Sequence, residues 1–203
     1  MTTISGTIIS GTIFYIRDGA YGTTCSDWSS AGACDSLPPT LVRGATYYIA
    51  DGNYDGYAFD DEESGSKVIT IKKATVFEHG SSIGWVDSYG DEQARWNANL
   101  TFGMNYYTAW AFLDNNYIVD GVTGGGPGNW TSGYGFVMSD QNPQRYFILI
   151  SDKFGFFGPR QDISNIRISH VEVNGLFGLC ASSHAVNASA SGVTKTNVSI
   201  SYS

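Results

Sequence analysis

The stretch Asn116-Tyr-Ile-Val-Asp-Gly-Val122 decides the fold, because its form returns twice later in the chain. The later copies are Asn165-Ile-Arg-Ile-Ser-His-Val171 and Asn197-Val-Ser-Ile-Ser-Tyr202, so the Asn positions stand 49 and then 32 residues apart. In each of these strand phrases an Asn precedes alternating β-branched or aromatic residues, which is typical of a short strand. A short strand that returns after tens of residues indicates a coiled stack of parallel strands.

The composition favours an all-β protein with many tight turns. The chain of 203 residues contains 25 Gly and 13 Tyr, and only 15% of its residues are charged. No segment shows a convincing helical period, and no apolar run approaches the length of a membrane span. We expect a single domain over residues 1–203, in which residues 1–13 form a strand extension or an end-pairing segment.

The net charge argues against nucleic acid as a partner. It is −8 at neutral pH, and the 11 Lys and Arg residues do not cluster. A phosphate backbone would be repelled by such a surface. The same charge disfavours a polyanionic polysaccharide unless a cation bridges the two, although solubility alone is a simpler reason for an acidic surface.

The cysteines and glycosylation sequons favour an extracellular or cell-surface location. Cys25 and Cys34 enclose a short, turn-rich loop that a disulfide can close, which leaves Cys180 as a buried thiol or as half of an intermolecular bond. A disulfide implies an oxidising compartment. Candidate N-glycosylation sites, each the Asn of an Asn-x-Ser/Thr sequon, are Asn99, Asn129, Asn187 and Asn197.

Further strand phrases carry a resemblance to a known superfamily. With the phrases above, Tyr47-Tyr-Ile-Ala-Asp-Gly-Asn-Tyr54 and Val68-Ile-Thr-Ile-Lys-Lys-Ala-Thr75 resemble the pectate-lyase-like right-handed parallel β-helix superfamily over most of residues 14–203. The likeness is closest to its secreted bacterial members without assigned activity. It implies about six or seven rungs of three short strands each, with one or two long loop excursions. The Trp-Ile-Asp-His and Arg-x-Pro-x-x-Arg signatures of pectate lyases are absent, so the resemblance implies a scaffold and assigns no catalytic residue.

One segment satisfies the pattern of a calcium-binding loop. Asp51, Asn53 and Asp55 stand at its first, third and fifth positions, and Glu62 at its twelfth. An EF-hand also needs a helix on each side, whereas the flanking residues indicate strands, and Asp-Gly is an ordinary turn sequence. Two interpretations stay open, a turn alone and a site for calcium, which is the one cofactor the sequence suggests.

Residues 77–98 form the least regular segment and are predicted to be a long excursion, where functional residues concentrate. Trp85 and Trp96 are candidates for stacking on sugar rings. Glycoside hydrolysis would need two carboxylates, for which the excursion offers Asp87, Asp91 and Glu92. A lyase would need a basic residue, for which the second half of the chain offers Arg145, Arg160 and Arg167.

The ends of the chain give the functional hypothesis. The tandem repeat of Ile-Ser-Gly-Thr-Ile over residues 4–13 is strand-like, and residues 197–203 stop within a strand phrase, so neither end shows a cap over its unpaired backbone groups. Either the chain begins a longer β-helix, or copies of it associate. We predict a non-catalytic, extracellular structural or surface-assembly protein that associates end to end into a filament. The alternative is a polysaccharide lyase, another carbohydrate-active β-helix protein, or a sugar-binding fragment of one.

Overall fold

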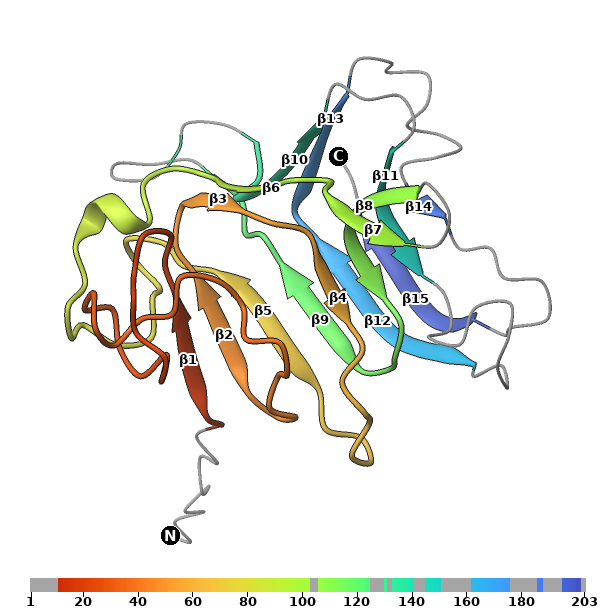
Figure 1. The fold of residues 1–203 in the computed structure, drawn as a ribbon, viewed down its shortest axis with the longest axis horizontal. Helices are drawn as coiled ribbons and strands as arrows, with labels where there is room; N and C mark the ends of the chain where they lie inside the picture. Colours follow the sequence, from red (N-terminus) through yellow and green to blue (C-terminus); the bar gives the residue numbers. More distant parts are fainter. Residues whose placement is uncertain are drawn as a thin grey trace, which may run out of the picture.

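The computed structural model describes residues 11–102, 106–124, 130, 133–140, 145–150, 162–175, 186–187 and 195–201. Within these ranges the regular structure is strand, apart from one turn of 3-10 helix, η1 (Asp87–Tyr89) (Figure 1). The prediction of an all-β protein is confirmed. No helix in the described part is long and apolar enough to cross a bilayer. Cys180, Asn129 and Arg160 lie outside the described residues.

The first sheet is parallel and has six strands, in the order β1-β2-β5-β9-β12-β15. Their bounds are β1 (Ile13–Ile16), β2 (Thr46–Ile49), β5 (Ile69–Lys73), β9 (Tyr117–Asp120), β12 (Ile163–Ser169) and β15 (Lys195–Ser201). The three strand phrases form β9, β12 and β15. Ile166 of the middle phrase pairs with Tyr117 on one side and Val198 on the other, so the copies stack in parallel, as their repetition predicts.

Two further sheets take up the rest of each circuit. The second has the order β13-β10-β6-β3, with β3 (Gly52–Tyr54), β6 (Ala94–Trp96), β10 (Phe136–Asp140) and β13 (Val171–Gly175). The third has the order β14-β11-β8-β4, with β4 (Tyr57–Phe59), β8 (Tyr106–Phe112), β11 (Arg145–Ile150) and β14 (Val186–Asn187). The short β7 (Leu100–Phe102) pairs with β8 in antiparallel fashion. From β2 onward the chain visits the first, second and third sheets in turn.

The core lies between the three sheets. In the first sheet, register places Ile71 between Tyr47 and Val119, and these inward side chains are all buried. Aromatic rings fill the space toward the third sheet, where Phe59 stacks on Phe112 with ring centroids 4.5 Å apart. This burial of large apolar side chains supplies the main driving force for the fold.

The turns that enter the first sheet rely on asparagine. Asn116 and Asn165 have positive φ angles of 63° and 56°, a left-handed conformation that Asn tolerates better than most residues. The Asn165 amide donates to Asn116 Oδ1 at 3.0 Å, and the Asn116 amide donates to the Gly65 carbonyl at 3.3 Å. Asn116 thus precedes β9 and Asn165 lies within β12, and each bonds to a neighbouring segment of the chain.

Arg43 joins three connections at the same turns. Its side chain is only 7% exposed, and its guanidinium donates to the carbonyls of Asn115 at 2.7 Å and Glu62 at 3.1 Å, and also to that of Asp61. The guanidinium carbon lies 4.7 Å from the centroid of the Tyr117 ring. A buried guanidinium is stabilised here by backbone carbonyls and an aromatic face.

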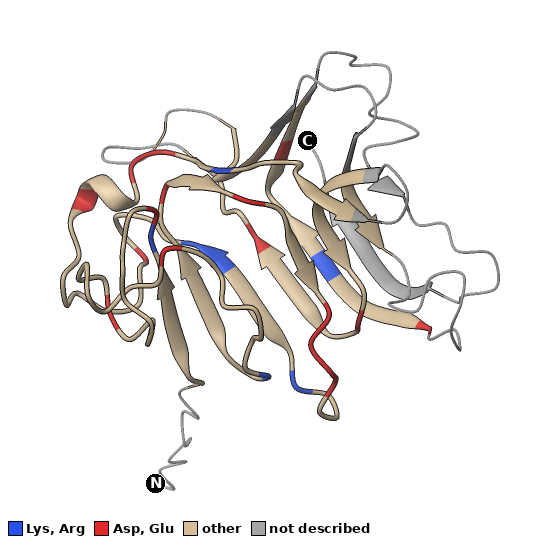
Figure 2. Cartoon of the chain, viewed as in Figure 1, with Lys and Arg blue, Asp and Glu red and all other residues tan. Residues whose placement is uncertain are grey.

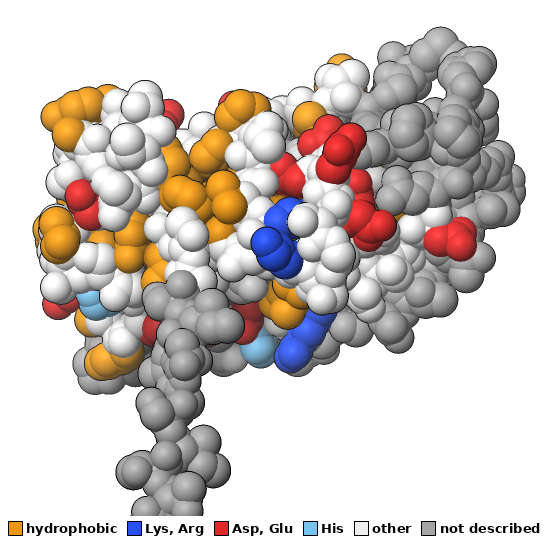
Figure 3. All heavy atoms as spheres, turned by 90° about the horizontal axis from the view of Figure 1, so that it is seen from below, with side chains coloured by type: hydrophobic (Ala, Val, Ile, Leu, Met, Phe, Trp, Pro, Cys, Tyr) orange, Lys and Arg blue, Asp and Glu red, His pale blue; other side chains and the backbone are white. Residues whose placement is uncertain are grey.

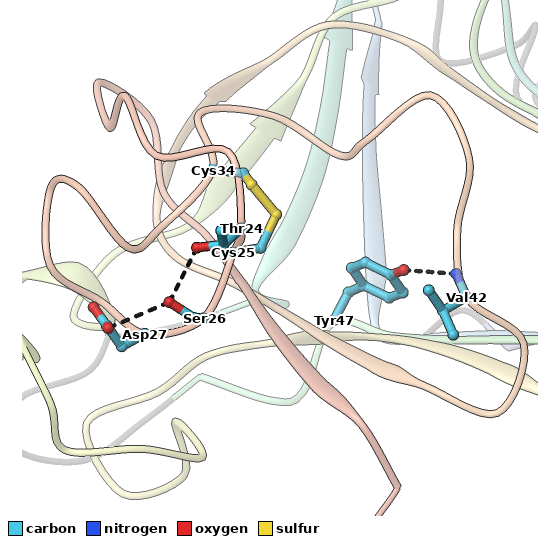
Figure 4. The surroundings of a disulfide bond; sticks show 7 residues. All are labelled: Thr24, Cys25, Ser26, Asp27, Cys34, Val42 and Tyr47. Atoms are coloured by element: carbon cyan, nitrogen blue, oxygen red, sulfur yellow. Dashed lines mark hydrogen bonds between the residues drawn. A yellow bond between two sulfur atoms is a disulfide. The ribbon is translucent and has the colours of Figure 1, made fainter.

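The connection between β1 and β2, residues 17–45, covers the outer edge of β1. Tyr15 N–H donates to the Cys25 carbonyl at 2.9 Å, and Cys34 N–H donates to the Tyr15 carbonyl at 3.0 Å. A disulfide joins Cys25 to Cys34, as Figure 4 shows. We call residues 17–45 the β1 cap. The expectation that this end lacks a cap is therefore wrong, because a loop closed by the disulfide satisfies the edge of the sheet.

The β1 cap also closes the core. Its Leu37 and Leu41 are buried within the main hydrophobic cluster. Leu41 N–H donates to Asp61 Oδ1 at 2.5 Å, and the Tyr57 hydroxyl donates to the Pro38 carbonyl at 2.6 Å. The cap is therefore fastened to the connection after β4 as well as to β1.

Charged residues are sparse on the surface. Figure 2 shows scattered Lys and Arg, with Asp and Glu mostly in the connections between strands. Seen from below, hydrophobic side chains gather toward one side of the molecule and acidic ones toward the other (Figure 3). Strongly exposed apolar side chains include Phe77, Ile83 and Val86 in the connection after β5.

Candidate functional site

A cavity of about 300 Å³ opens where the β1 cap meets β3 and β4. We call it the cap cavity. The β1 cap contributes Asp35, Ser36 and Leu37, the β3–β4 segment contributes residues 53–57, and β6 contributes Trp96. The lining therefore combines three segments that are far apart in the sequence.

The floor of the cap cavity is aromatic and rigid. Tyr54 and Trp96 are 3% and 2% exposed, and their ring centroids lie 5.2 Å apart. The Tyr54 hydroxyl donates to the Ala50 carbonyl at 3.1 Å and accepts from Asp18 N–H at 3.2 Å. Burial raises the pKa of Tyr54, so its hydroxyl stays protonated at neutral pH.

The rim carries two carboxylates, each fixed through one oxygen. Asp35 Oδ1 accepts from Gly19 N–H at 2.7 Å, and Asp55 Oδ1 accepts from the Asn99 amide at 2.6 Å. Within the described part of the chain, the second oxygen of each carboxylate receives no hydrogen bond. Asn53, also exposed on the rim, adds an amide that can both donate and accept.

Backbone hydrogen bonds hold the walls in place without a ligand. Asn53 N–H donates to Asp18 Oδ2 at 2.9 Å, and Gly56 N–H donates to Asn99 Oδ1 at 2.7 Å. Such a preformed site loses little conformational entropy when it binds.

Two glycines permit this close approach. Gly52 has a φ of 137°, and a Cβ there would lie 2.5 Å from Asp18 Cβ. A Cβ on Gly56 would lie 2.6 Å from the Thr108 carbonyl oxygen. Only glycine lets the β3–β4 segment lie against both the β1 cap and β8.

The floor contains a buried donor without a partner. Within the described residues, Trp96 Nε1 is buried and has no hydrogen-bond partner, and the same holds for Trp110 Nε1. The two indole rings lie 5.4 Å apart. Buried polar groups are nearly always satisfied, so these two indole N–H groups are exceptions within the core.

The predicted calcium ligands are not brought together. Strands β3 and β4 run through the segment and belong to different sheets, which separates Asp51 from Glu62. Asp51 Oδ2 accepts from Glu92 N–H at 3.1 Å, while Asn53 and Asp55 face the cap cavity. In the described residues, no group of three or more His, Cys, Asp or Glu side chains is arranged to hold a metal ion.

The two predicted sugar-stacking tryptophans have different surroundings. β6 places the Trp96 ring in the core under the cap cavity, where it is 2% exposed, so little of the ring is free to stack on a sugar. Trp85 is half-buried and stacks on His79 with centroids 4.1 Å apart, and its Nε1 donates to Asp87 at 3.1 Å. It lies outside the lining of the cavity. The irregular excursion is also shorter than predicted, because β6 occupies Ala94–Trp96.

The sequons have varied positions. Asn99 is exposed, but both atoms of its amide group are used by Asp55 and Gly56 at the cavity wall. Asn187 and Asn197 lie in β14 and β15. The role of Asn99 in shaping the cavity had no signal in the sequence apart from the sequon itself.

A second polar cluster lies where the chain leaves the first sheet. Lys73 occupies an inward position of β5 and is fully buried, with Nζ 2.6 Å from the Ala74 carbonyl and 5.4 Å from the centroid of the Trp130 ring. Burial lowers the pKa of Lys73 to about 8, although the carboxylates of Asp51 and Asp91 oppose this shift. Burial likewise raises the pKa of Asp51 to about 6.

Asp120 and His170 form a half-exposed pair in the next two circuits. Asp120 Oδ1 and His170 Nδ1 lie 2.6 Å apart, and Val122 N–H also donates to Asp120 Oδ1 at 3.0 Å. Burial alone would raise the pKa of Asp120, but these hydrogen bonds outweigh it, so the pKa is lowered. The pair is remote from the residues that line the cap cavity.

No protein-family model matches the chain, and neither a curated protein nor a solved structure matches it. The chemistry of the site is therefore interpreted from its own geometry.

Proposed function

We propose that the chain is a right-handed parallel β-helix of the pectate-lyase-like kind that acts outside the cell and binds carbohydrate, without catalysis, in the cap cavity. The ordered visits to three parallel sheets support the architecture, since parallel crossovers are almost always right-handed. The disulfide in the β1 cap supports an oxidising compartment.

The observation that carries the binding proposal is a preformed cavity with an aromatic floor and a rim of carboxylates and an amide. Sugar rings present apolar C–H faces to aromatic side chains, of which the half-buried Tyr57 is the accessible one in this lining, and their hydroxyls bond to fixed polar groups. The volume of about 300 Å³ is at the lower end of ligand cavities, so it suits a single sugar residue or a short fragment.

Binding is favoured over catalysis by the nature of the lining. No Arg, Lys or His is among the residues that line the cavity, so the base of a lyase is missing there. The excursion carboxylates Asp87, Asp91 and Glu92 do not line it either. End-to-end association through β1 has no support, because the β1 cap already occupies that edge.

Calorimetric titration of the protein with a panel of monosaccharides and short oligosaccharides tests the proposal. We expect binding by the wild type, weakened at least about tenfold in Asn53→Ala, which removes a rim amide that no other described side chain uses. Asn97→Ala is the matched control, because Asn97 is exposed but does not line the cavity. Absence of binding to every sugar, or equal losses in the two variants, would contradict the proposal.

A further inference from the structure

We infer that the cap cavity selects neutral sugars and rejects uronates, an inference that rests on the proposed carbohydrate-binding function. The cavity has carboxylates on its rim and behind its wall. Asp35 and Asp55 are on its rim, and the Asp18 carboxylate lies directly behind Asn53, whose N–H it accepts. A sugar carboxylate in the cavity would therefore face carboxylates on two sides.

Basic residues do not offset this charge. Arg17 points away from the cavity, because its guanidinium donates to Ser30 and lies 4.7 Å from the Tyr89 ring centroid. Among the described residues, Arg95 is the basic residue beside the rim, because it pairs in register with Asn53 across β3 and β6. It does not line the cavity, so a sugar seated on the floor meets the two carboxylates first.

The hydrogen-bonding groups of the cavity also match a neutral sugar. The second oxygens of Asp35 and Asp55 are acceptors, so they suit hydroxyl donors and not another carboxylate. The donors among the lining side chains are few, namely the Ser36 hydroxyl and the Asn53 amide, and each can meet a ring or hydroxyl oxygen. A neutral sugar satisfies both kinds of group, whereas a uronate leaves like charges close together in a partly desolvated site.

Matched sugar pairs that differ only in the carboxylate provide the test. Glucose and glucuronate, and galactose and galacturonate, are titrated into the wild type in the presence of EDTA, and then with added Ca²⁺. We expect the neutral member of at least one pair to bind, and its uronate to bind at least about tenfold more weakly in EDTA. Equal or tighter uronate binding in EDTA would overturn the inference while leaving the carbohydrate-binding proposal intact. Binding of neither member of any tested pair would overturn both.

Variants that remove the carboxylate charges test whether these charges cause the discrimination against uronates. Asp35→Asn with Asp55→Asn keeps the size of the rim and removes its charge, and each free carboxylate oxygen becomes an NH2 donor. The discrimination against the uronate should therefore shrink several-fold, while thermal unfolding and near-UV dichroism stay close to the wild type. If the double variant does not fold, Asp35→Asn alone serves, because its backbone contact with Gly19 can persist through the amide oxygen. Unchanged discrimination in a folded variant would overturn the inference. So would uronate binding that disappears in Arg95→Gln, since Arg95 would then decide the specificity.

Discussion

The two ends of the first sheet, where the chain enters it and where the chain leaves it, contain different kinds of polar residue. The entry corner, near the starts of β2, β9 and β12, contains Arg43, Asn115, Asn116 and Asn165. The guanidinium and the Asn116 amide donate there to backbone carbonyls, and the Asn165 amide donates to Asn116 Oδ1. The exit corner, at or just beyond the ends of β2, β5, β9 and β12, contains Asp51, Lys73, Asp120 and His170, which are all titratable.

This difference affects how the stability contributed by each corner depends on pH. Amides do not titrate, and arginine keeps its proton throughout the usual pH range, so these groups of the entry corner contribute the same stability in acid and in base. Asp61, which accepts from the Tyr117 hydroxyl beside Arg43, is the exception, because burial raises its pKa. The exit corner contains groups whose pKa values differ between the folded and unfolded chain, so its contribution changes with pH.

The largest effect is expected from Arg43→Ala in the entry corner. Removing the guanidinium leaves carbonyls of two other connections without this donor, which should cost about 3 kcal/mol or more of the free energy of unfolding. Urea unfolding at neutral pH measures it. Arg167→Ala, at an exposed position of β12, is the control and should change stability by less than about 0.5 kcal/mol. Full stability of Arg43→Lys would show that the planar guanidinium is not required.

The next largest effect is expected from Lys73, and it tests whether the exit corner makes stability depend on pH. Its pKa falls from 10.5 to about 8 on folding, so the unfolded chain binds more protons between these values and stability should rise with pH across that window. Over the full window the rise amounts to about 3 kcal/mol. Lys73→Met should lack it, as unfolding midpoints between about pH 7.5 and 9.5 can show. Lys72→Met, which changes an outward side chain, should retain it; a rise of equal size in Lys73→Met would refute the assignment.

Asn116 tests whether backbone conformation or hydrogen bonding dominates the entry corner. Asn116→Ala should lose about 1–2 kcal/mol, because alanine disfavours the left-handed region and cannot bond to Gly65 or Asn165. Asn116→Gly should lose less, since glycine adopts a positive φ freely. Thermal unfolding of the two variants side by side gives the comparison. Equal losses would assign the whole effect to the amide.

The smallest effect is expected at the half-exposed Asp120–His170 pair. The lowered pKa of Asp120 gives stability that is complete above its unfolded pKa of 3.8 and is lost as the pH falls through the lower folded value. Solvent screening should keep the contribution below about 1 kcal/mol. Asp120→Asn should therefore lower stability by less than about 1 kcal/mol at neutral pH and leave it unchanged in strong acid, which flattens the acid limb of the stability curve. A large loss at neutral pH would show that the pair is more than a surface contact.

More of the entry corner than of the exit corner can be predicted from the sequence. The Asn of each strand phrase, the alternation after it and the repeat itself predict which strands stack and which residues turn. Lys73 also follows the alternation of β5, but a lysine in an inward position contradicts the usual exposure of charged side chains, so its burial depends on the tertiary structure. Arg43 has no neighbouring motif at all, because its partners are carbonyls up to 73 residues away.

The cap cavity shows the same limit. The short spacing of Cys25 and Cys34 suggested their disulfide, but nothing local connects Asp35 with Asp55 or with Trp96. Asn53 and Asp55 fit a calcium-loop pattern. Because β3 and β4 make this segment extended, the two residues line the cavity instead. Trp96 was expected on a loop. It lies instead at the end of the three-residue strand β6, which places its ring in the core.

The β1 cap has a consequence for the order in which parts of the chain fold. Its hydrogen bonds to Asn53, Tyr57 and Asp61 span 35, 19 and 20 residues, so they close early relative to the length of the chain. Short loops close quickly, and contacts of low sequence separation speed folding. The segment that ends near Asp61 can thus become ordered during synthesis, and each later strand then finds a finished edge to join. Growth of the sheet is directional because its first edge is sealed and only the other is open to the next strand.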